Sequence, residues 1–166
     1  MGRIWMPLDN AALIFPAIRR RNWNNVFRQS ITLREDVDPA LLQRAVDQLM
    51  PRFPSFYLRL RRGGCWYYLE EVKAAPTVQE DYAYPLTFMT KREMGRCCLR
   101  VLYYRNRIAV EYFHVLSDGG GAMVYLKTLV ARYLTLRYGT EIPSTDGVLR
   151  LKSASSSSVY CGSMPR

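Results

Sequence analysis

The chain's only histidine, His114, lies where an apolar segment gives way to three consecutive glycines, in the sequence RIAVEYFHVLSDGGG of residues 107–121. An imidazole changes charge near neutral pH, so its neutral form can take a proton from a hydroxyl or an amine. Asp118 follows four residues later and could hold the imidazole's orientation through the backbone or a partner arginine. These residue types indicate general-base chemistry. A structural interpretation stays open, because a single histidine at a strand end commonly forms rim hydrogen bonds and Asp-Gly-Gly commonly makes a turn.

The segments on both sides of His114 have contrasting periodicities. Apolar residues alternate before it, which predicts a half-buried strand with His114 on the face of Ile108, Val110 and Tyr112. Asp118 is a candidate helix N-cap, and the glycines after it tolerate positive φ or close approach. A helix is predicted over residues 122–138, with an apolar stripe of Met123, Leu126, Val130 and Leu134.

The sequence HVLSDGG, between an apolar strand and a helix, resembles the H-x-x-x-D-G motif of the chloramphenicol-acetyltransferase-like acyltransferases. This superfamily includes alcohol acetyltransferases, plant BAHD acyltransferases and peptide-synthetase condensation domains. The resemblance implies that His114 deprotonates an acceptor alcohol or amine for attack on an acyl thioester such as acyl-CoA. It implies no tightly bound cofactor. Phe113 stands where condensation domains carry a first histidine, which favours the single-histidine alcohol acetyltransferase branch.

The same resemblance assigns roles to the residues that follow the histidine. Asp118 would be structural and paired to an arginine from early in the chain, for which Arg28 and residues 19–21 are candidates. Gly119 and Gly120 would let the loop pass close to the substrate channel and so contribute to substrate binding. No metal site is expected.

The resemblance covers residues 5–148, which correspond to the N-terminal half of a two-lobed enzyme. The expected organisation is therefore an N-terminal lobe over residues 1–148 and a disordered, serine-rich tail over residues 149–166. The second lobe and its D-F-G-W-G type motif have no counterpart. Either a missing C-terminal lobe or a homo-oligomer would have to complete the site. The chain length favours truncation, and the abrupt serine-rich end suggests a frameshift or an artificial terminus.

Composition bounds the remaining possibilities. A chain of 166 residues with 49% hydrophobic residues suffices for one globular core. The formal net charge of +10 permits attraction to phosphates of nucleic acid, an anionic membrane surface or coenzyme A. An alternative function is therefore a catalytically inactive basic module that binds nucleic acid or an acidic partner. Phosphate binding at the glycine-rich helix start is a weaker option, because no G-x-x-x-x-G-K or G-x-G-x-x-G sequence is present.

The four cysteines form no C-x-x-C pair and have no histidine at ligand spacing, which argues against zinc and favours reduced thiols in a cytoplasmic protein. The N-terminus does not resemble a signal peptide, and no apolar run approaches the roughly 20 residues of a membrane span.

Further elements complete a fold prediction. A strand is expected over residues 26–33, and a helix from Pro39 to about Met50, with Asp38 as its N-cap and Leu41, Leu42, Ala45 and Leu49 buried. Two hairpins are expected, over residues 55–71 and 97–115. An Arg105-Asn106 turn in the second would place Asn in the left-handed region and pair Arg100 with Glu111, Val101 with Val110, and Cys97 with His114. The predicted fold class is α/β (α+β), a two-layer sandwich whose mixed, largely antiparallel sheet is packed by helices, like half of chloramphenicol acetyltransferase.

Overall fold

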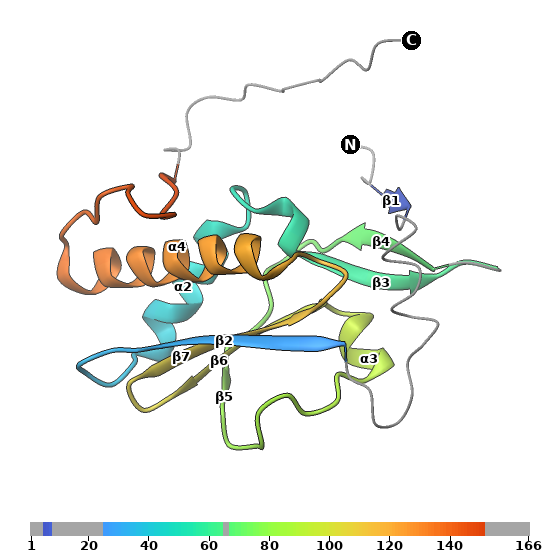
Figure 1. The fold of residues 1–166 in the computed structure, drawn as a ribbon, viewed down its shortest axis with the longest axis horizontal. Helices are drawn as coiled ribbons and strands as arrows, with labels where there is room; N and C mark the ends of the chain where they lie inside the picture. Colours follow the sequence, from blue (N-terminus) through green and yellow to red (C-terminus); the bar gives the residue numbers. More distant parts are fainter. Residues whose placement is uncertain (1–4, 8–24, 65–66, 152–166) are drawn as a thin grey trace, which may run out of the picture.

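The computed structural model describes residues 5–7, 25–64 and 67–151 (Figure 1). The arginines at positions 19–21, which were candidate partners of Asp118, and nearly all of the predicted serine-rich tail lie outside these ranges. The elements in chain order are β1 Trp5–Pro7, β2 Val26–Thr32, α2 Pro39–Leu49, the 3₁₀ helix η1 Pro54–Phe56, β3 Leu58–Arg62, β4 Tyr67–Glu71, β5 Gln79–Glu80, α3 Lys91–Met94, β6 Leu99–Tyr104, β7 Arg107–Phe113 and α4 Gly119–Tyr138.

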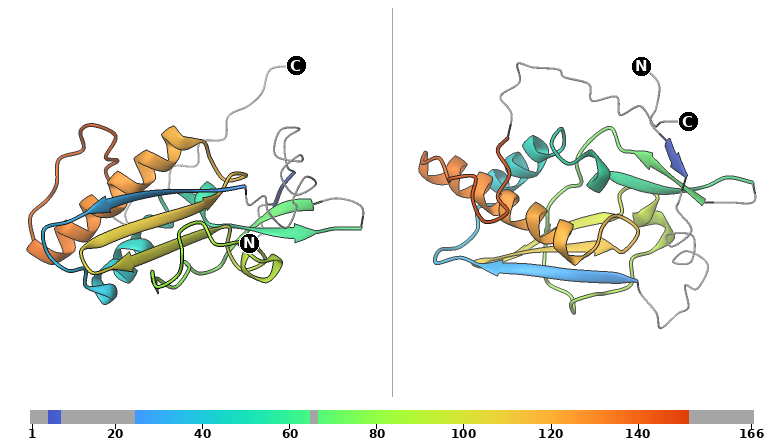
Figure 2. Two further views of the ribbon diagram at one scale, coloured as in Figure 1. Left: turned by 60° about the horizontal axis from the view of Figure 1, so that its bottom comes forward. Right: turned by 45° about the horizontal axis from the view of Figure 1, so that its top comes forward.

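The larger sheet has four strands in the order β2-β7-β6-β5, all antiparallel except for the short parallel pair β5-β6. Helices α2 and α4 pack side by side on one face of this sheet, as Figures 1 and 2 show. A second sheet, in the order β1-β4-β3, contains the predicted hairpin of β3 and β4. The predicted class, a mixed α/β fold with largely antiparallel sheets and packed helices, is confirmed.

The β6-β7 hairpin has the predicted register, in which Arg100 pairs with Glu111 and Val101 with Val110. The ladder of paired residues ends at Leu99 and Tyr112, and the Phe113 N–H donates to the Cys98 carbonyl at 3.0 Å in the same register. Cys97 and His114 lie beyond this last contact, so their predicted pairing stays a prediction. His114 donates its backbone N–H to the carbonyl of Asn25, at 2.8 Å, because β2 continues alongside β7 beyond the end of β6.

The turn of this hairpin also differs from the prediction. The residue with positive φ is Arg105, at 47°, and not Asn106. The Asn106 side chain instead makes a hydrogen bond, in which its Nδ2 donates to the carbonyl of Leu33 at 2.8 Å. The turn is thereby tied to the end of β2.

Helix α2 begins as predicted, with the Asp38 carboxylate accepting hydrogen bonds from the backbone N–H groups of Ala40 and Leu41. Helix α4 begins at Gly119, three residues before the predicted start at Ala122. Its buried side differs from the predicted stripe, because Met123 is 39% exposed. The fully buried residues are Ala122, Tyr125, Leu126, Leu129 and Tyr133. Apolar residues occur around most of this helix, so their spacing does not identify the buried side.

A cluster of tyrosines lies at the centre of the core, between the sheet and the helices. The Tyr57 and Tyr125 hydroxyl oxygens are 2.8 Å apart, and Tyr57 Oη also donates to the carbonyl of Val46. Tyr112 Oη on β7 donates to the carbonyl of Ala122 on α4, at 3.1 Å. Burial raises the pKa of all three phenols, which therefore stay protonated. Their hydrogen bonds remove the cost of placing hydroxyl groups in the core.

Cys97 and Cys98 are buried free thiols, in keeping with the predicted reduced state of these two residues. Burial raises the pKa of the Cys97 thiol to about 11. Within the described part of the chain, no helix has the length and apolar character needed to cross a membrane.

Candidate active site

Residues 114–118 form the loop between β7 and α4, and His114 opens it. The loop's first backbone N–H donates to the carbonyl of Asn25, the residue just before β2. The imidazole is exposed, and its ring centroid lies 4.8 Å from that of Phe27. Phe27 in turn stacks on Tyr112 with centroids 5.0 Å apart. Because Tyr112 bonds to α4, the aromatic contact places the imidazole on the helix-facing side of the sheet. His114 thus combines a fixed backbone with an accessible side chain.

Asp118 closes the loop as the N-cap of α4. Its Oδ1 accepts a hydrogen bond from the backbone N–H of Gly121 at 2.8 Å, and its carbonyl accepts from Ala122 at 3.1 Å. Such a cap satisfies backbone donors that the first helical turn leaves open, and its negative charge lies at the positive end of the helix dipole. The carboxylate is exposed and makes no ion pair with an arginine among residues 25–64 and 67–151.

The three glycines have different roles. A side chain at Gly119 would meet nothing within 4 Å, so the space beside the loop is open there. A Cβ at Gly121, by contrast, would collide with Ser117 Oγ and lie 3.3 Å from Asp118 Oδ1. Gly121 is therefore the glycine with the least room for a side chain, and a substitution there would have to displace the Ser117 hydroxyl. Positive φ does not require a glycine here, because the described glycines with positive φ are Gly139 and Gly147.

Edge strand β2 also holds the start of α4. Gln29 Nε2 donates to the carbonyl of Gly119 at 2.9 Å, a contact between residues 90 positions apart. The candidate residues His114, Asp118, Gly119 and Gly120 consequently form one continuous corner, supported on one side by β2. The sequence did not indicate Gln29 or Phe27 as supports, because nothing in their local pattern shows which strand would lie beside β7.

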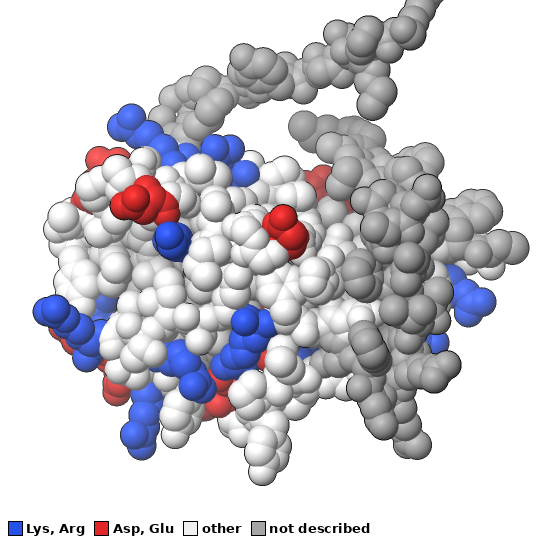
Figure 3. Space-filling model, in the orientation of Figure 1, with Lys and Arg blue, Asp and Glu red and all other residues white. Residues whose placement is uncertain are grey.

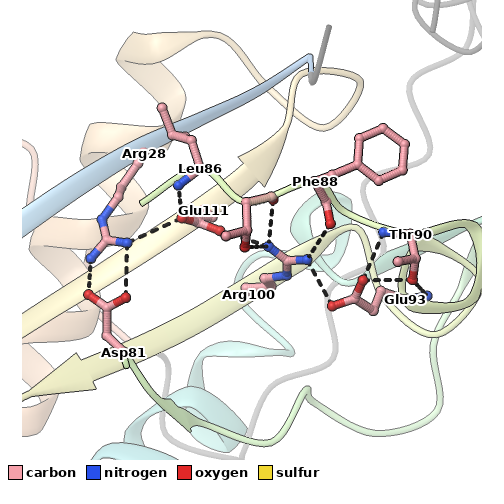
Figure 4. Close-up of polar contacts among 9 residues, drawn as sticks. Arg28, Asp81, Leu86, Phe88, Thr90, Glu93, Arg100 and Glu111 are labelled. Carbon is pink, nitrogen blue, oxygen red and sulfur yellow. Dashed lines mark hydrogen bonds and ion pairs between the residues drawn. The ribbon is translucent and has the colours of Figure 1, made fainter. Parts of the chain in front are cut away.

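Arg28, one of the arginine candidates for Asp118, points to the opposite face of the sheet. There it forms ion pairs with Asp81 and, at 3.2 Å, with Glu111 (Figure 4). Arg100 completes the network through Glu111, at 3.0 Å, and Glu93, at 2.8 Å. We call these five residues the ionic network.

Two carboxylates of the ionic network, those of Asp81 and Glu93, are held in their charged form. Burial raises the pKa of Asp81, but hydrogen bonds and charges from Arg28 and Arg107 outweigh burial, so the pKa lies below its usual value. For Glu93, too, burial raises the pKa. Hydrogen bonds from Thr90 and the charge of Arg100 outweigh burial, so the pKa of Glu93 also lies below its usual value. Of this network, sequence reasoning found only the cross-strand pair of Arg100 and Glu111.

The described residues contain no group of three or more histidine, cysteine, aspartate or glutamate side chains placed to bind one metal ion. The chemistry available at the β7-α4 corner is that of an exposed imidazole beside an open, glycine-lined helix start.

Comparisons with known proteins identify the fold of this chain. No protein-family model and no curated protein sequence matches the chain. Solved structures do match. The SgcC5 protein from Streptomyces globisporus matches with a TM-score of 0.62 and 16% identity over 89% of this chain and 39% of its own. The epimerization domain from the third module of tyrocidine synthetase B has a TM-score of 0.62 and 12% identity, over 92% and 38%.

The first condensation domain of the calcium-dependent antibiotic synthetase has a TM-score of 0.62 and 14% identity, over 86% of this chain and 40% of that domain. At these identities the likeness shows the fold, which is that of one part of condensation-domain-like proteins. The chain spans 38% to 40% of the length of these three structures.

Proposed function

We propose that this chain forms the lobe of an acyltransferase that carries the general base. His114 takes the proton from an alcohol or amine acceptor, whose oxygen or nitrogen then attacks the carbonyl carbon of an acyl thioester such as acyl-CoA. The carbon–sulfur bond breaks, the acyl group passes to the acceptor, and the thiolate leaves and takes up a proton. The reaction needs no metal and no bound cofactor.

The observation that carries this proposal is the placement of His114. It is exposed at the end of a central strand, beside the capped start of α4, in a fold shared with condensation and epimerization domains. A general base must reach the proton that it removes while its own position is restrained. Asn25 restrains the backbone and Phe27 the ring, while the side chain stays accessible.

The donor surface belongs, in this proposal, to a second lobe or a second copy of the chain. The similar structures are about two and a half times as long as the matched part, which leaves room for such a lobe in them. Positioning of donor and acceptor together supplies a large share of the rate in acyl transfer. Activity of this chain alone should therefore be slow, and should rise when the other lobe is supplied.

A thiol-release assay tests the proposal. The full chain would be incubated with acetyl-CoA or longer acyl-CoA donors and a panel of small alcohols and amines, and free coenzyme A measured. His114→Ala should lower acceptor-dependent release by about a hundredfold or more, the usual contribution of a general base. Tyr138→Phe, at the far end of α4, is the matched control and should not change it. Full activity in the His114→Ala protein would exclude this role for His114.

A further inference from the structure

The exposed large apolar side chains of this protein are concentrated on one loop, residues 82–88. Seven such side chains are exposed among the described residues, and four of them lie here at alternating positions. They are Tyr82 at 88% exposure, Tyr84 at 89%, Leu86 at 43% and Phe88 at 41%. We call residues 82–88 the aromatic loop. Single exposed apolar residues are ordinary, but a contiguous set marks a contact surface.

The ionic network contacts the backbone of the aromatic loop from the side of the sheet. Glu111, only 2% exposed, accepts a hydrogen bond from the Leu86 N–H at 2.9 Å. Arg100 donates to the carbonyls of Thr87, at 3.1 Å, and Phe88, at 3.3 Å. Figure 4 shows both side chains reaching the loop from the sheet. A backbone fixed in this way presents its apolar side chains without further ordering, which favours binding to another surface.

Basic residues flank the aromatic loop. Lys91 and Arg92 follow it and are exposed, and Arg107, 41% exposed, contacts Asp81 just before it. The three carboxylates of the ionic network are balanced by three guanidinium groups, those of Arg28, Arg100 and Arg107. Lys91 and Arg92 therefore supply the basic charge beside the loop, and Glu80 is the exposed acid closest in sequence. The loop runs along the lower side of the molecule in Figure 1, and Figure 3 shows basic side chains together with acidic ones on the lower part of the same view.

We propose that the aromatic loop is a contact site for an anionic membrane surface. Tyrosine and phenylalanine rings suit the headgroup region of a bilayer, and lysine and arginine beside them attract acidic lipid phosphates. Leu86 favours a lipid surface over single-stranded nucleic acid, because base stacking uses aromatic rings and gains little from an aliphatic side chain. The formal net charge of +10 has the required sign.

This contact is independent of the proposed acyl transfer. The loop covers the sheet face opposite to α2 and α4 (Figure 2), whereas His114 lies on the helix-facing side. A bilayer bound at the aromatic loop would leave the β7-α4 corner accessible. Loss of one activity in a variant therefore does not imply loss of the other.

Vesicle co-sedimentation tests the proposal with the full chain. The probes are vesicles of phosphatidylcholine alone and of phosphatidylcholine with one quarter phosphatidylglycerol, at low salt. The wild-type chain should bind the anionic vesicles, and the double variant Tyr82→Ser/Tyr84→Ser should bind them about tenfold more weakly. Lys91→Gln and Arg92→Gln should each weaken binding by about fivefold. Tyr138→Ser, which removes an exposed tyrosine elsewhere, is the control and should bind like wild type.

Several results would overturn the proposal. One is no binding of the wild-type chain to anionic vesicles at low salt, and another is equal binding by the wild-type chain and the double tyrosine variant. Tyrosine-dependent binding of a single-stranded oligonucleotide, with no vesicle binding, would assign the loop to nucleic acid instead. Tyrosine-dependent dimerisation in light scattering, again without vesicle binding, would assign it to a second copy. Because Tyr82 and Tyr84 are nearly fully exposed, their replacement leaves the fold intact.

Discussion

The two faces of strand β7 are built on different principles. On the helix-facing side, Ile108, Val110 and Tyr112 have no exposed surface and form the centre of the apolar core. On the other side, Glu111 is almost equally buried but is surrounded by charge, between Arg28 and Arg100. The apolar face follows from alternation within seven consecutive residues, whereas the charged face depends on residues as far as 83 positions away.

The difference extends to what each face supports. The apolar face ends in His114 and the capped start of α4, where we propose proton transfer. The charged face holds the aromatic loop, where we propose membrane contact. A buried carboxylate is costly unless it is fully paired, so the ionic network specifies the position of the loop more than it adds net stability. The experiments below separate these contributions.

Removal of Glu111 should have the largest effect on stability. In Glu111→Ala, the guanidinium groups of Arg28 and Arg100, 11% and 10% exposed, lose their shared partner and Leu86 loses its acceptor. Breaking one side of a buried ion pair costs about 3–5 kcal/mol, to be measured by urea unfolding. The control is Glu141→Ala, at an exposed glutamate, which should change little. A loss below about 1 kcal/mol would show that water replaces the carboxylate and that the charged face is not truly dry.

On the apolar face, Leu126→Ala should cost about 3 kcal/mol. Leu126 is fully buried on α4, and truncation of a buried leucine leaves a cavity. Met123→Ala, three residues earlier and 39% exposed, should cost less than about 0.5 kcal/mol. Denaturant unfolding of this pair tests which side of α4 is buried. Similar losses in both variants would contradict the orientation of the helix.

The charged face should also make stability depend on pH. The folded pKa of Asp81 lies below its ordinary value of 3.8, so its contribution is complete above that value and is lost as pH falls through the folded pKa. Asp81→Asn should remove about 2 kcal/mol at pH 7, typical of charge-assisted hydrogen bonds. The variant should also lose less stability than wild type between pH 5 and strongly acidic solution. Parallel pH curves for the two proteins would exclude this contribution.

The sequence was informative where signals are local. The Asp38 cap and the β6-β7 register rest on neighbouring residues or on strict alternation, and the structure confirms them. The fold class, also confirmed, was predicted with the help of the resemblance of HVLSDGG to a known motif. The ion pairs of Arg28, Asp81 and Glu93 join separate parts of the chain to β6 and β7, and the spacing of residues in the sequence does not predict such contacts. The buried side of α4 was predicted only in part, since Leu126 and Val130 are buried but Met123 is exposed, because apolar residues surround the helix. The positions of His114 and Asp118 at one corner followed from adjacency in sequence, while their chemical roles stay predictions.

The smallest effect is expected at Asp118, and it separates geometry from charge. Asp118→Ala removes the acceptor of the Gly121 N–H and should cost about 1 kcal/mol by urea unfolding. Asp118→Asn should cost close to nothing, since asparagine is an equally good N-cap. In the thiol-release assay, full activity of the Asp118→Asn variant and reduced activity of the Asp118→Ala variant would mean that Asp118 acts by holding the loop. If the two variants were equally inactive although Asp118→Asn keeps the cap, the carboxylate charge itself would be required, for which an arginine outside residues 25–64 and 67–151 is the expected partner.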